Sequence, residues 1–241
     1  SVFFLLTGGP GTGKTTTISR LLQLLHYQFN ENSAKENSTA LRVGLAAPTG
    51  KAATRLGESL RVAMASPELS FAEAIEAKTL HRLLGSKPNS VRFQHDAKNP
   101  LPLDVLIVDE ASMIDLPLMC KLLEALPLQT RLILVGDPDQ LPSVETGNVL
   151  RACCEAIAKR AHLDRVYRQA ADTDIGIAAL MVLSGNGTQF IQGLQTGSYR
   201  GLHWQSVNIG ALEEILRLKA VSHYRKIQQA VSLEQALALS K

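Results

Sequence analysis

A glycine-rich segment near the start of the chain has the spacing of a phosphate-binding loop. It reads GGPGTGKT over residues 8–15, with Gly8 and Gly13 five positions apart and followed by Lys14 and Thr15. Such glycines let successive backbone N–H groups face one anion at the start of a helix. Lys14 would reach the β- and γ-phosphates of a nucleotide, and the Thr15 hydroxyl would ligate Mg²⁺.

Two adjacent acidic residues, Asp109 and Glu110, follow the apolar run of residues 105–108. Ligands gather at the carboxyl ends of the strands in open parallel sheets. Asp109 would hold Mg²⁺ through water, and Glu110 would polarise an attacking water. By itself the pair also fits an ordinary cap of the next helix. Together with the phosphate loop it favours a nucleotide hydrolase over a metabolite kinase.

Two later segments carry polar groups that suit a phosphate site. Gln140, in the sequence GDPDQLP of residues 136–142, could touch both the γ-phosphate and the lytic water, or could simply be solvated. Tyr167 and Arg168 follow in the sequence YRQ. An arginine there could stabilise γ-phosphate charge, but spacing alone indicates no more than a surface ion pair for Arg168.

Two segments between these motifs could contact a phosphodiester backbone. Thr49 and Lys51 lie where an apolar run gives way to a helical pattern, which offers backbone N–H groups and a cation to a phosphate. Thr79 and His81 occupy a similar start of a helix in the sequence TLHRLLG. By itself, each segment is explained better by a structural role than by DNA contact.

Short apolar runs alternate with amphipathic patterns, which predicts an α/β fold with a parallel sheet covered by helices on both faces. The runs at 2–6, 42–46, 105–108 and 132–135 predict strands, and a short strand is expected near 162–163. Residues 31–39 predict a polar loop, and 66–84 predict two short helices. The remainder is mostly helical, through 149–160, 174–183 and 209–229.

The composition indicates a globular intracellular protein. The chain has 241 residues with 45% hydrophobic and 20% charged side chains, and its apolar runs are too short to span a bilayer. Its three cysteines show no metal-ligand spacing, which indicates a reducing compartment and a cytoplasmic location. The net charge of +3 includes an acidic segment at 101–150 between two basic ones. This distribution suits a metal site beside a polyanion and equally suits solvated charge on helices.

Taken in order, these motifs resemble those of superfamily 1 DNA helicases of the RecD family, the alpha subunit of exodeoxyribonuclease V. The resemblance covers about residues 1–170 and rests on six segments: GGPGTGKTTT, APTGKAATRL, TLHRLLG, VDEASM, VGDPDQLPSV and VYRQ. It implies a RecA-like P-loop NTPase motor that uses ATP and Mg²⁺ to move 5′ to 3′ on single-stranded DNA. It also implies binding to DNA ends within a heterotrimer with the beta and gamma subunits, in recombinational repair of double-strand breaks.

The resemblance assigns a role to each candidate residue. Gln140 becomes the sensor of the nucleotide state, Arg168 the γ-phosphate arginine and Tyr167 a neighbour of the adenine. The DNA contacts are Thr49, Lys51, Thr79 and His81. The catalytic residues are Lys14, Glu110, Gln140 and Arg168, and the metal ligands are Thr15 and Asp109. The nucleotide site comprises Gly8, Gly9, Pro10, Gly11, Thr12, Gly13, Lys14, Thr15, Thr16 and Tyr167.

Residues 1–170 are thus expected to form the motor core and 171–241 its helical continuation. Such helicases need a second RecA-like domain, and nothing in 171–241 matches its motifs. We therefore expect this chain by itself to bind nucleotide weakly and not to unwind DNA. Three alternatives stay open at this point: a helicase that works without the other two subunits, a ring-forming AAA+ ATPase, and a scaffold with an inactive loop. A GTPase is excluded because no Asn-Lys-x-Asp motif is present.

Overall fold

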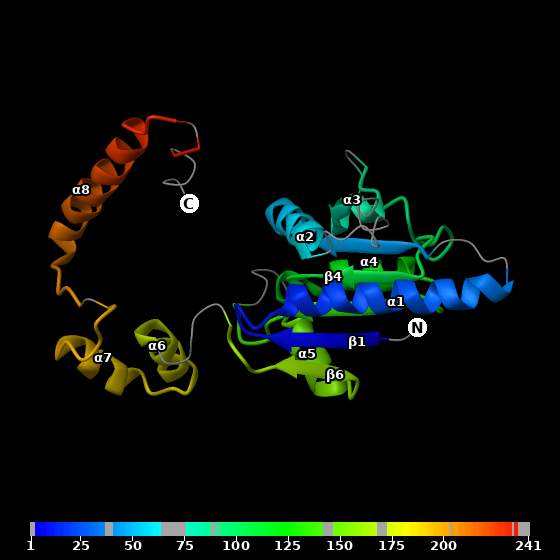
Figure 1. The fold of residues 1–241 in the computed structure, drawn as a ribbon, viewed down its shortest axis with the longest axis horizontal. Helices are drawn as coiled ribbons and strands as arrows, with labels where there is room; N and C mark the ends of the chain where they lie inside the picture. Colours follow the sequence, from blue (N-terminus) through cyan, green and yellow to red (C-terminus); the bar gives the residue numbers. More distant parts are fainter. Residues whose placement is uncertain are drawn as a thin grey trace. The chain divides into compact units, whose positions relative to one another are not determined.

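The computed structural model describes residues 3–36, 41–63, 76–87, 90, 92–141, 147–167, 173–202, 204–232 and 234–235 (Figure 1). The chain divides into two compact units, Ser1–Ala170 and Ala171–Lys241. None of the helices within the described ranges combines the length and apolarity needed to cross a membrane.

The first unit is a six-stranded sheet in which every strand pair is parallel. Its strands, in the sheet order β3-β2-β4-β5-β1-β6, are Ala77–Thr79, Val43–Ala47, Val105–Val108, Arg131–Gly136, Phe3–Gly8 and Arg160–Leu163. The helices of this unit are α1 Lys14–Glu36, α2 Gly50–Ala63, α3 Leu80–Leu84, the 3₁₀ helix η2 Ala111–Met113, α4 Leu116–Ala125 and α5 Val149–Ala156. The predicted α/β fold with a parallel sheet flanked by helices is confirmed.

Alternating side chains of the central strands bury against helices on opposite faces of the sheet. In β4, Val105 and Ile107 belong to one hydrophobic cluster, whereas Leu106 and Val108 belong to another. The first cluster includes apolar side chains of α1 and α2, and the second includes those of α3, α4 and α5. A strand buried on both faces needs a continuous apolar run, which is why VLIV forms the centre of the sheet.

The register of the sheet brings the ends of distant segments to one edge. Thr7 of β1 lies opposite Gly136 of β5 and His162 of β6. Val108 of β4 lies opposite Leu134 of β5. The loops that follow β1, β2, β4, β5 and β6 therefore start at the same edge, which is where ligands bind in parallel sheets.

Three of the expected boundaries are wrong. Of the two short helices expected within 66–84, one is present as α3, and residues 66–75 lie outside the described residues. The run at 77–79, expected to be helical, forms β3 because it pairs with β2. Helix α1 continues to Glu36, into the expected loop, because no Gly or Pro interrupts residues 15–36. Helix α5 ends at Ala156, and the chain then returns to the sheet as β6, which confirms the short strand expected near 162–163.

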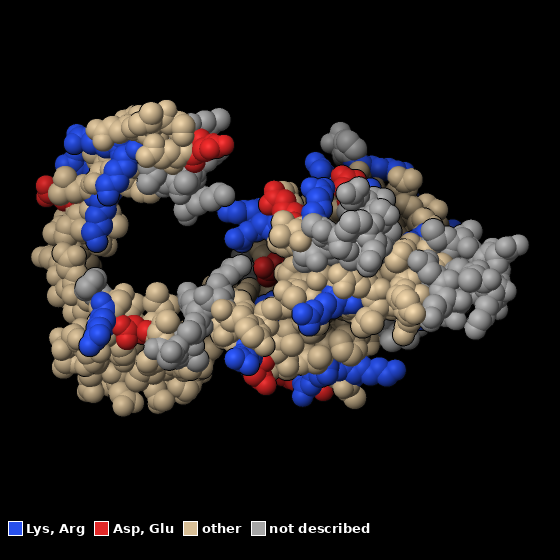
Figure 2. Space-filling model, viewed as in Figure 1, with Lys and Arg blue, Asp and Glu red and all other residues tan. Residues whose placement is uncertain are grey.

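The second unit contains three helices among its described residues: α6 Asp174–Leu183, α7 Gly187–Gln195 and α8 Ile209–Gln228. The predicted helices at 174–183 and 209–229 are confirmed, whereas the sequence analysis missed α7. Helices α6 and α7 pack together. The Tyr199 hydroxyl donates a hydrogen bond to Met181 Sδ over 3.1 Å, and the rings of Phe190 and Tyr199 are 5.7 Å apart. Most of the surface of this unit in Figure 2 is neither acidic nor basic.

Candidate nucleotide site

The glycine-rich loop joins β1 to α1, as a phosphate-binding loop requires. Gly11 and Gly13 have φ angles of 77° and 89°, a left-handed conformation that other residues adopt at a cost. Gly8 has no room for a side chain, because a Cβ atom there would lie 2.8 Å from the Leu163 carbonyl oxygen. These glycines allow the tight turn that directs backbone N–H groups toward a bound anion.

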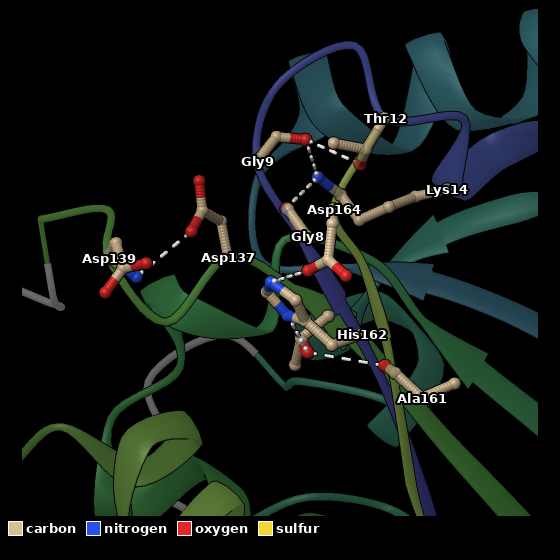
Figure 3. Close-up of polar contacts among 10 residues, drawn as sticks. Gly8, Gly9, Thr12, Lys14, Asp137, Asp139, Ala161, His162 and Asp164 are labelled. Carbon is tan, nitrogen blue, oxygen red and sulfur yellow. Dashed lines mark hydrogen bonds and ion pairs between the residues drawn. The ribbon is translucent and has the colours of Figure 1, made fainter. Parts of the chain in front are cut away.

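The ammonium group of Lys14 lies against the backbone of this loop (Figure 3). Lys14 Nζ donates hydrogen bonds to the carbonyl oxygens of Gly8 and Gly9 over 2.6 and 3.0 Å. The Thr12 hydroxyl donates to the same Gly9 oxygen over 2.8 Å. The cation is therefore held beside the loop that surrounds the anion site.

Asp109 and Glu110 follow β4 directly, and their geometry differs from that of a simple helix cap. Burial raises the pKa of the Asp109 carboxyl above its usual range, and the nearby Glu110 charge raises it further. The Glu110 N–H and the Lys14 charge act in the opposite direction. Asp109 Oδ1 accepts a hydrogen bond from the Glu110 N–H over 2.9 Å. Glu110 has φ 53° and ψ 40°, and among the described residues it is the only one other than glycine with a positive φ. Strained backbone of this kind is concentrated at functional sites.

Gln140 lies in a turn that starts where β5 ends. Its N–H donates to the Asp137 carbonyl oxygen over 3.3 Å, and the Asp137 carboxylate accepts from the Asp139 N–H over 3.0 Å. Figure 3 shows the contact between Asp137 and Asp139. Asp137 is 6% exposed, so the turn is anchored by a buried carboxylate.

A pocket of about 850 Å³ gathers most of the predicted residues, a size typical of ligand sites. The predicted residues that line it are Pro10, Gly11, Thr12, Gly13, Lys14, Thr15, Thr16, Thr49, Lys51, Asp109, Glu110, Gln140 and Tyr167. Gly8 and Gly9 are not among the lining residues. They lie at the start of the loop, where their carbonyl oxygens hold Lys14. Arg168 lies outside the described residues.

Sequence reasoning did not single out five other lining residues: Ala52, Arg55, Leu56, Ser59 and Met113. Arg55 is the notable one, since it lies on α2 one helical turn after Lys51. The i, i+4 spacing of two cations on a helix was the available signal. The pocket lining carries both signs of charge, with Lys14, Lys51 and Arg55 beside Asp109 and Glu110.

The four candidate DNA contacts fall into two groups. Thr49 and Lys51 line the pocket, and the Thr49 hydroxyl accepts from the Ala52 N–H over 3.2 Å at the start of α2. Thr79 and His81 do not line it. Thr79 caps α3 by accepting from the Arg82 N–H, and the His81 ring lies 5.8 Å from the ring of Phe93.

The segment that follows β6 lies along the phosphate loop. The Tyr167 N–H donates to the Gly11 carbonyl oxygen over 2.8 Å, and the Arg165 guanidinium lies 5.2 Å from the centre of the Tyr167 ring. Closer to the sheet, the Thr7 hydroxyl lies 2.8 Å from His162 Nδ1, and His162 Nε2 lies 3.2 Å from Asp164 (Figure 3). These contacts connect β6 to Thr7 in β1, and the segment after β6 to Gly11 within the loop.

Comparison with known proteins agrees with this geometry. The family described as "AAA domain" matches residues 1–146. The chain is 43% identical to the RecBCD enzyme subunit RecD of Mycolicibacterium smegmatis over 232 residues, which are 95% of this chain and 40% of that protein. It is 45% identical to the ATP-dependent RecD2 DNA helicase of Deinococcus radiodurans over 180 residues, which are 75% of this chain and 21% of that protein.

The Pif1 helicase of Candida albicans, a solved structure, has a TM-score of 0.46 and 24% identity, over 71% of this chain and 38% of that one. The chain spans less than half of the length of the RecD and RecD2 proteins that it matches. The AAA domain match covers more than half of the chain and contains the phosphate loop, the acid pair and Gln140. The chain therefore belongs to the AAA domain family and resembles the RecD helicases, as its motifs predict.

Proposed function

We propose that this chain is the ATP-hydrolysing motor domain of a RecD-like DNA helicase. The observation that carries the proposal is that the phosphate loop, the acid pair, Gln140 and the start of α2 all line one pocket. A scaffold with an inactive loop has no need for this convergence of a cation, two carboxylates and an amide.

Lys14 and the loop are proposed to bind the triphosphate. Among the described residues no carboxylate forms an ion pair with the Lys14 ammonium, which lies at the loop, so its charge is available to the β- and γ-phosphates. Tyr167 is 69% exposed and lines the same pocket, where its ring would flank the adenine.

Mg²⁺ fits the oxygen donors of this pocket. Thr15 and Asp109 both line it. Burial raises the pKa of the Asp109 carboxyl, and a nearby cation would lower that pKa again by favouring the charged form. Within the described ranges no group of three His, Cys, Asp or Glu side chains could hold a metal by itself. This suits Mg²⁺, which commonly uses one or two carboxylates and the phosphates of its substrate. When bound, the ion would neutralise charge that develops on the phosphate oxygens.

Glu110 is proposed as the base of hydrolysis. Its carboxylate would polarise a water whose oxygen attacks the γ-phosphorus, while the bond from that phosphorus to the β–γ bridging oxygen breaks. The products are ADP and inorganic phosphate. Gln140 would orient the water, and Lys14 and Arg168 would stabilise the charge that develops.

DNA contact is proposed at Thr49, Lys51, Thr79 and His81, with single-stranded DNA and DNA ends as the substrate. Helix starts with a neighbouring cation suit backbone phosphates, so little preference for base sequence is expected. For the full-length protein we propose movement along DNA in the 5′ to 3′ direction and assembly with the beta and gamma subunits of exodeoxyribonuclease V. We also propose a role in double-strand break repair and a cytoplasmic location. The name of the Mycolicibacterium relative supports the complex, whereas that of the Deinococcus relative supports a stand-alone helicase.

We assign residues 1–170 to the motor core and 171–241 to its helical continuation, with the second RecA-like domain outside this chain. Residues 1–241 alone are therefore expected to bind ATP weakly and to leave duplex DNA intact. Efficient unwinding by these residues alone would contradict this assignment.

The deciding experiment measures ATP hydrolysis by the full-length protein with and without oligo(dT). Strong stimulation of hydrolysis by single-stranded DNA is expected. A hydrolysis rate that does not change when DNA is added would instead support an AAA+-type ATPase. Unwinding of duplexes with a 5′ or a 3′ single-stranded tail tests the direction of movement. Co-purification with the beta and gamma subunits separates the complex from the stand-alone helicase.

A further inference from the structure

The hydroxyl group of Ser112 is buried without a hydrogen-bond partner among the described residues. Ser112 is 3% exposed. A buried hydroxyl that makes no hydrogen bond costs folding free energy, and such groups in native structures call for an explanation. Other buried hydroxyls of this unit are bonded: Ser19 donates to the Thr16 carbonyl oxygen over 2.8 Å, and Thr130 donates to that of Leu103 over 2.7 Å.

Ser112 lies between the two segments that carry the proposed water-activating groups. It belongs to η2, which starts directly after Glu110, and η2 packs on β5 and α5. The contact with β5 is tight. A Cβ atom added at Gly136 would lie 3.3 Å from the backbone nitrogen of Ser112 and 2.7 Å from Leu150 Cδ2. At Gly136 the end of β5 therefore lies close to the backbone of η2.

The turn after Gly136 contains Gln140 and is held by its own hydrogen bonds to Asp137. A shift of this turn would therefore pass directly to η2 and to Glu110, because close-packed backbone transmits displacement. Asp137 and Ser112 are both buried at that junction, but Asp137 is hydrogen-bonded, whereas the Ser112 hydroxyl has no partner among the described residues. A hydroxyl can both donate and accept a hydrogen bond.

We infer that Ser112 is a positioning residue for nucleotide hydrolysis. Its hydroxyl bonds to a backbone group of residues 136–140 only when Glu110 and Gln140 are arranged around the attacking water. A bond that forms only in that arrangement favours it over the nucleotide-free one. This inference rests on the proposed function, and it adds the connection between the acid pair and the Gln140 turn.

The test compares Ser112→Ala with Thr130→Val in the full-length protein. Thr130 is an equally buried hydroxyl at the opposite end of β5, and its hydroxyl is bonded. For Ser112→Ala we expect an unchanged or higher Tm without nucleotide, a DNA-stimulated kcat at least tenfold lower, and a KM for ATP within about twofold of the wild type. For Thr130→Val we expect a lower Tm and an unchanged kcat.

A second comparison asks whether Ser112 acts through the Gln140 turn. The double variant Ser112→Ala/Gln140→Ala should hydrolyse ATP no more than about twofold slower than Gln140→Ala, because groups that act as a unit are not additive. Multiplicative losses would overturn the inference. So would a Ser112→Ala protein that keeps its kcat or loses Tm as Thr130→Val does. A wild type that hydrolyses no ATP would overturn the proposed function itself, which distinguishes the two failures.

Discussion

At the scale of single residues, Glu110 combines a proposed chemical role with a strained backbone. A residue with a side chain in the left-handed region costs about 1–2 kcal/mol, and Asn tolerates that region better than Gln. We expect both Glu110→Gln and Glu110→Asn to lower kcat by roughly 10²–10⁴-fold, the usual worth of a positioned base, with nucleotide binding retained. Glu110→Asn should also have the higher Tm of the two. Equal hydrolysis by wild type and Glu110→Gln would remove Glu110 from the mechanism.

The contribution of Asp109 to the stability of the folded protein is expected to depend on pH. Burial raises the pKa of its carboxyl in the folded protein, so ionisation there opposes folding. The destabilisation is absent below the ordinary Asp pKa of about 3.9, develops as pH rises toward the raised value, and is complete above it. Asp109→Asn keeps an oxygen for the Glu110 N–H. It should raise Tm at pH 7 by a few degrees, at about 2–4 °C for each kcal/mol.

The increase in Tm caused by Asp109→Asn should become smaller as the pH falls toward 4. Thermal melts without nucleotide or Mg²⁺ measure it. A gain that does not depend on pH would show that burial of the Asp109 charge is not its cause. The same variant should lose Mg²⁺-dependent hydrolysis, since Thr15 and Asp109 are the proposed ligands. If Asp109→Asn loses hydrolysis but its Tm does not change, Asp109 binds the metal and the burial of its charge does not destabilise the folded protein.

Much of this site follows from sequence because its parts are contiguous. The phosphate loop and the pair Asp109–Glu110 each lie within one short segment, so residue types and spacing predict them. Ser112 and Arg55 were not predicted, because their significance depends on what packs beside them in three dimensions. The left-handed backbone of Glu110 was equally invisible, since Glu is not a residue that favours it.

At the scale of elements, the phosphate loop depends on the close approach of β1 and β6 at Gly8. A Cβ atom there would lie 2.7 Å from the Thr12 hydroxyl oxygen and 2.8 Å from the Leu163 carbonyl oxygen, whereas one at Gly9 would meet nothing within 4 Å. We expect Gly8→Ala to lower the free energy of unfolding by about 1–3 kcal/mol, the usual cost of overpacking. Gly9→Ala is the matched control and should change it by less than about 0.5 kcal/mol. Chemical denaturation measures both, and equal values would contradict the close approach.

Element boundaries were less predictable than the central strands. The run VLIV at 105–108 is apolar throughout, so it can form only a buried element, and its short length favours a strand. The strand at 77–79 is Ala-Lys-Thr, which carries no strand signal of its own and exists because β2 offers an edge for pairing. The short strand β6 was expected, whereas helix α5 was expected to run to residue 160 and instead ends at Ala156.

At the scale of the whole molecule, the two units differ in how much apolar surface they bury. Among the described residues of 171–241, Ala178 alone is buried, and large apolar side chains such as Leu183, Ile209 and Tyr224 are 68%, 88% and 66% exposed. The first unit instead has two hydrophobic clusters on the faces of its sheet. Segments with few buried apolar contacts open at low free energy, so they are cut first by proteases.

Limited proteolysis of residues 1–241 should therefore cleave within 171–241 first and leave a resistant fragment that contains β1 to β6. An ATP analogue should protect that fragment further without slowing the first cuts, because the proposed nucleotide contacts all lie in the first unit. Mass spectrometry of the digestion products locates the cuts. Early cleavage inside the sheet, or equal resistance of both units, would show that residues 171–241 gain their stability from contacts other than their own buried core.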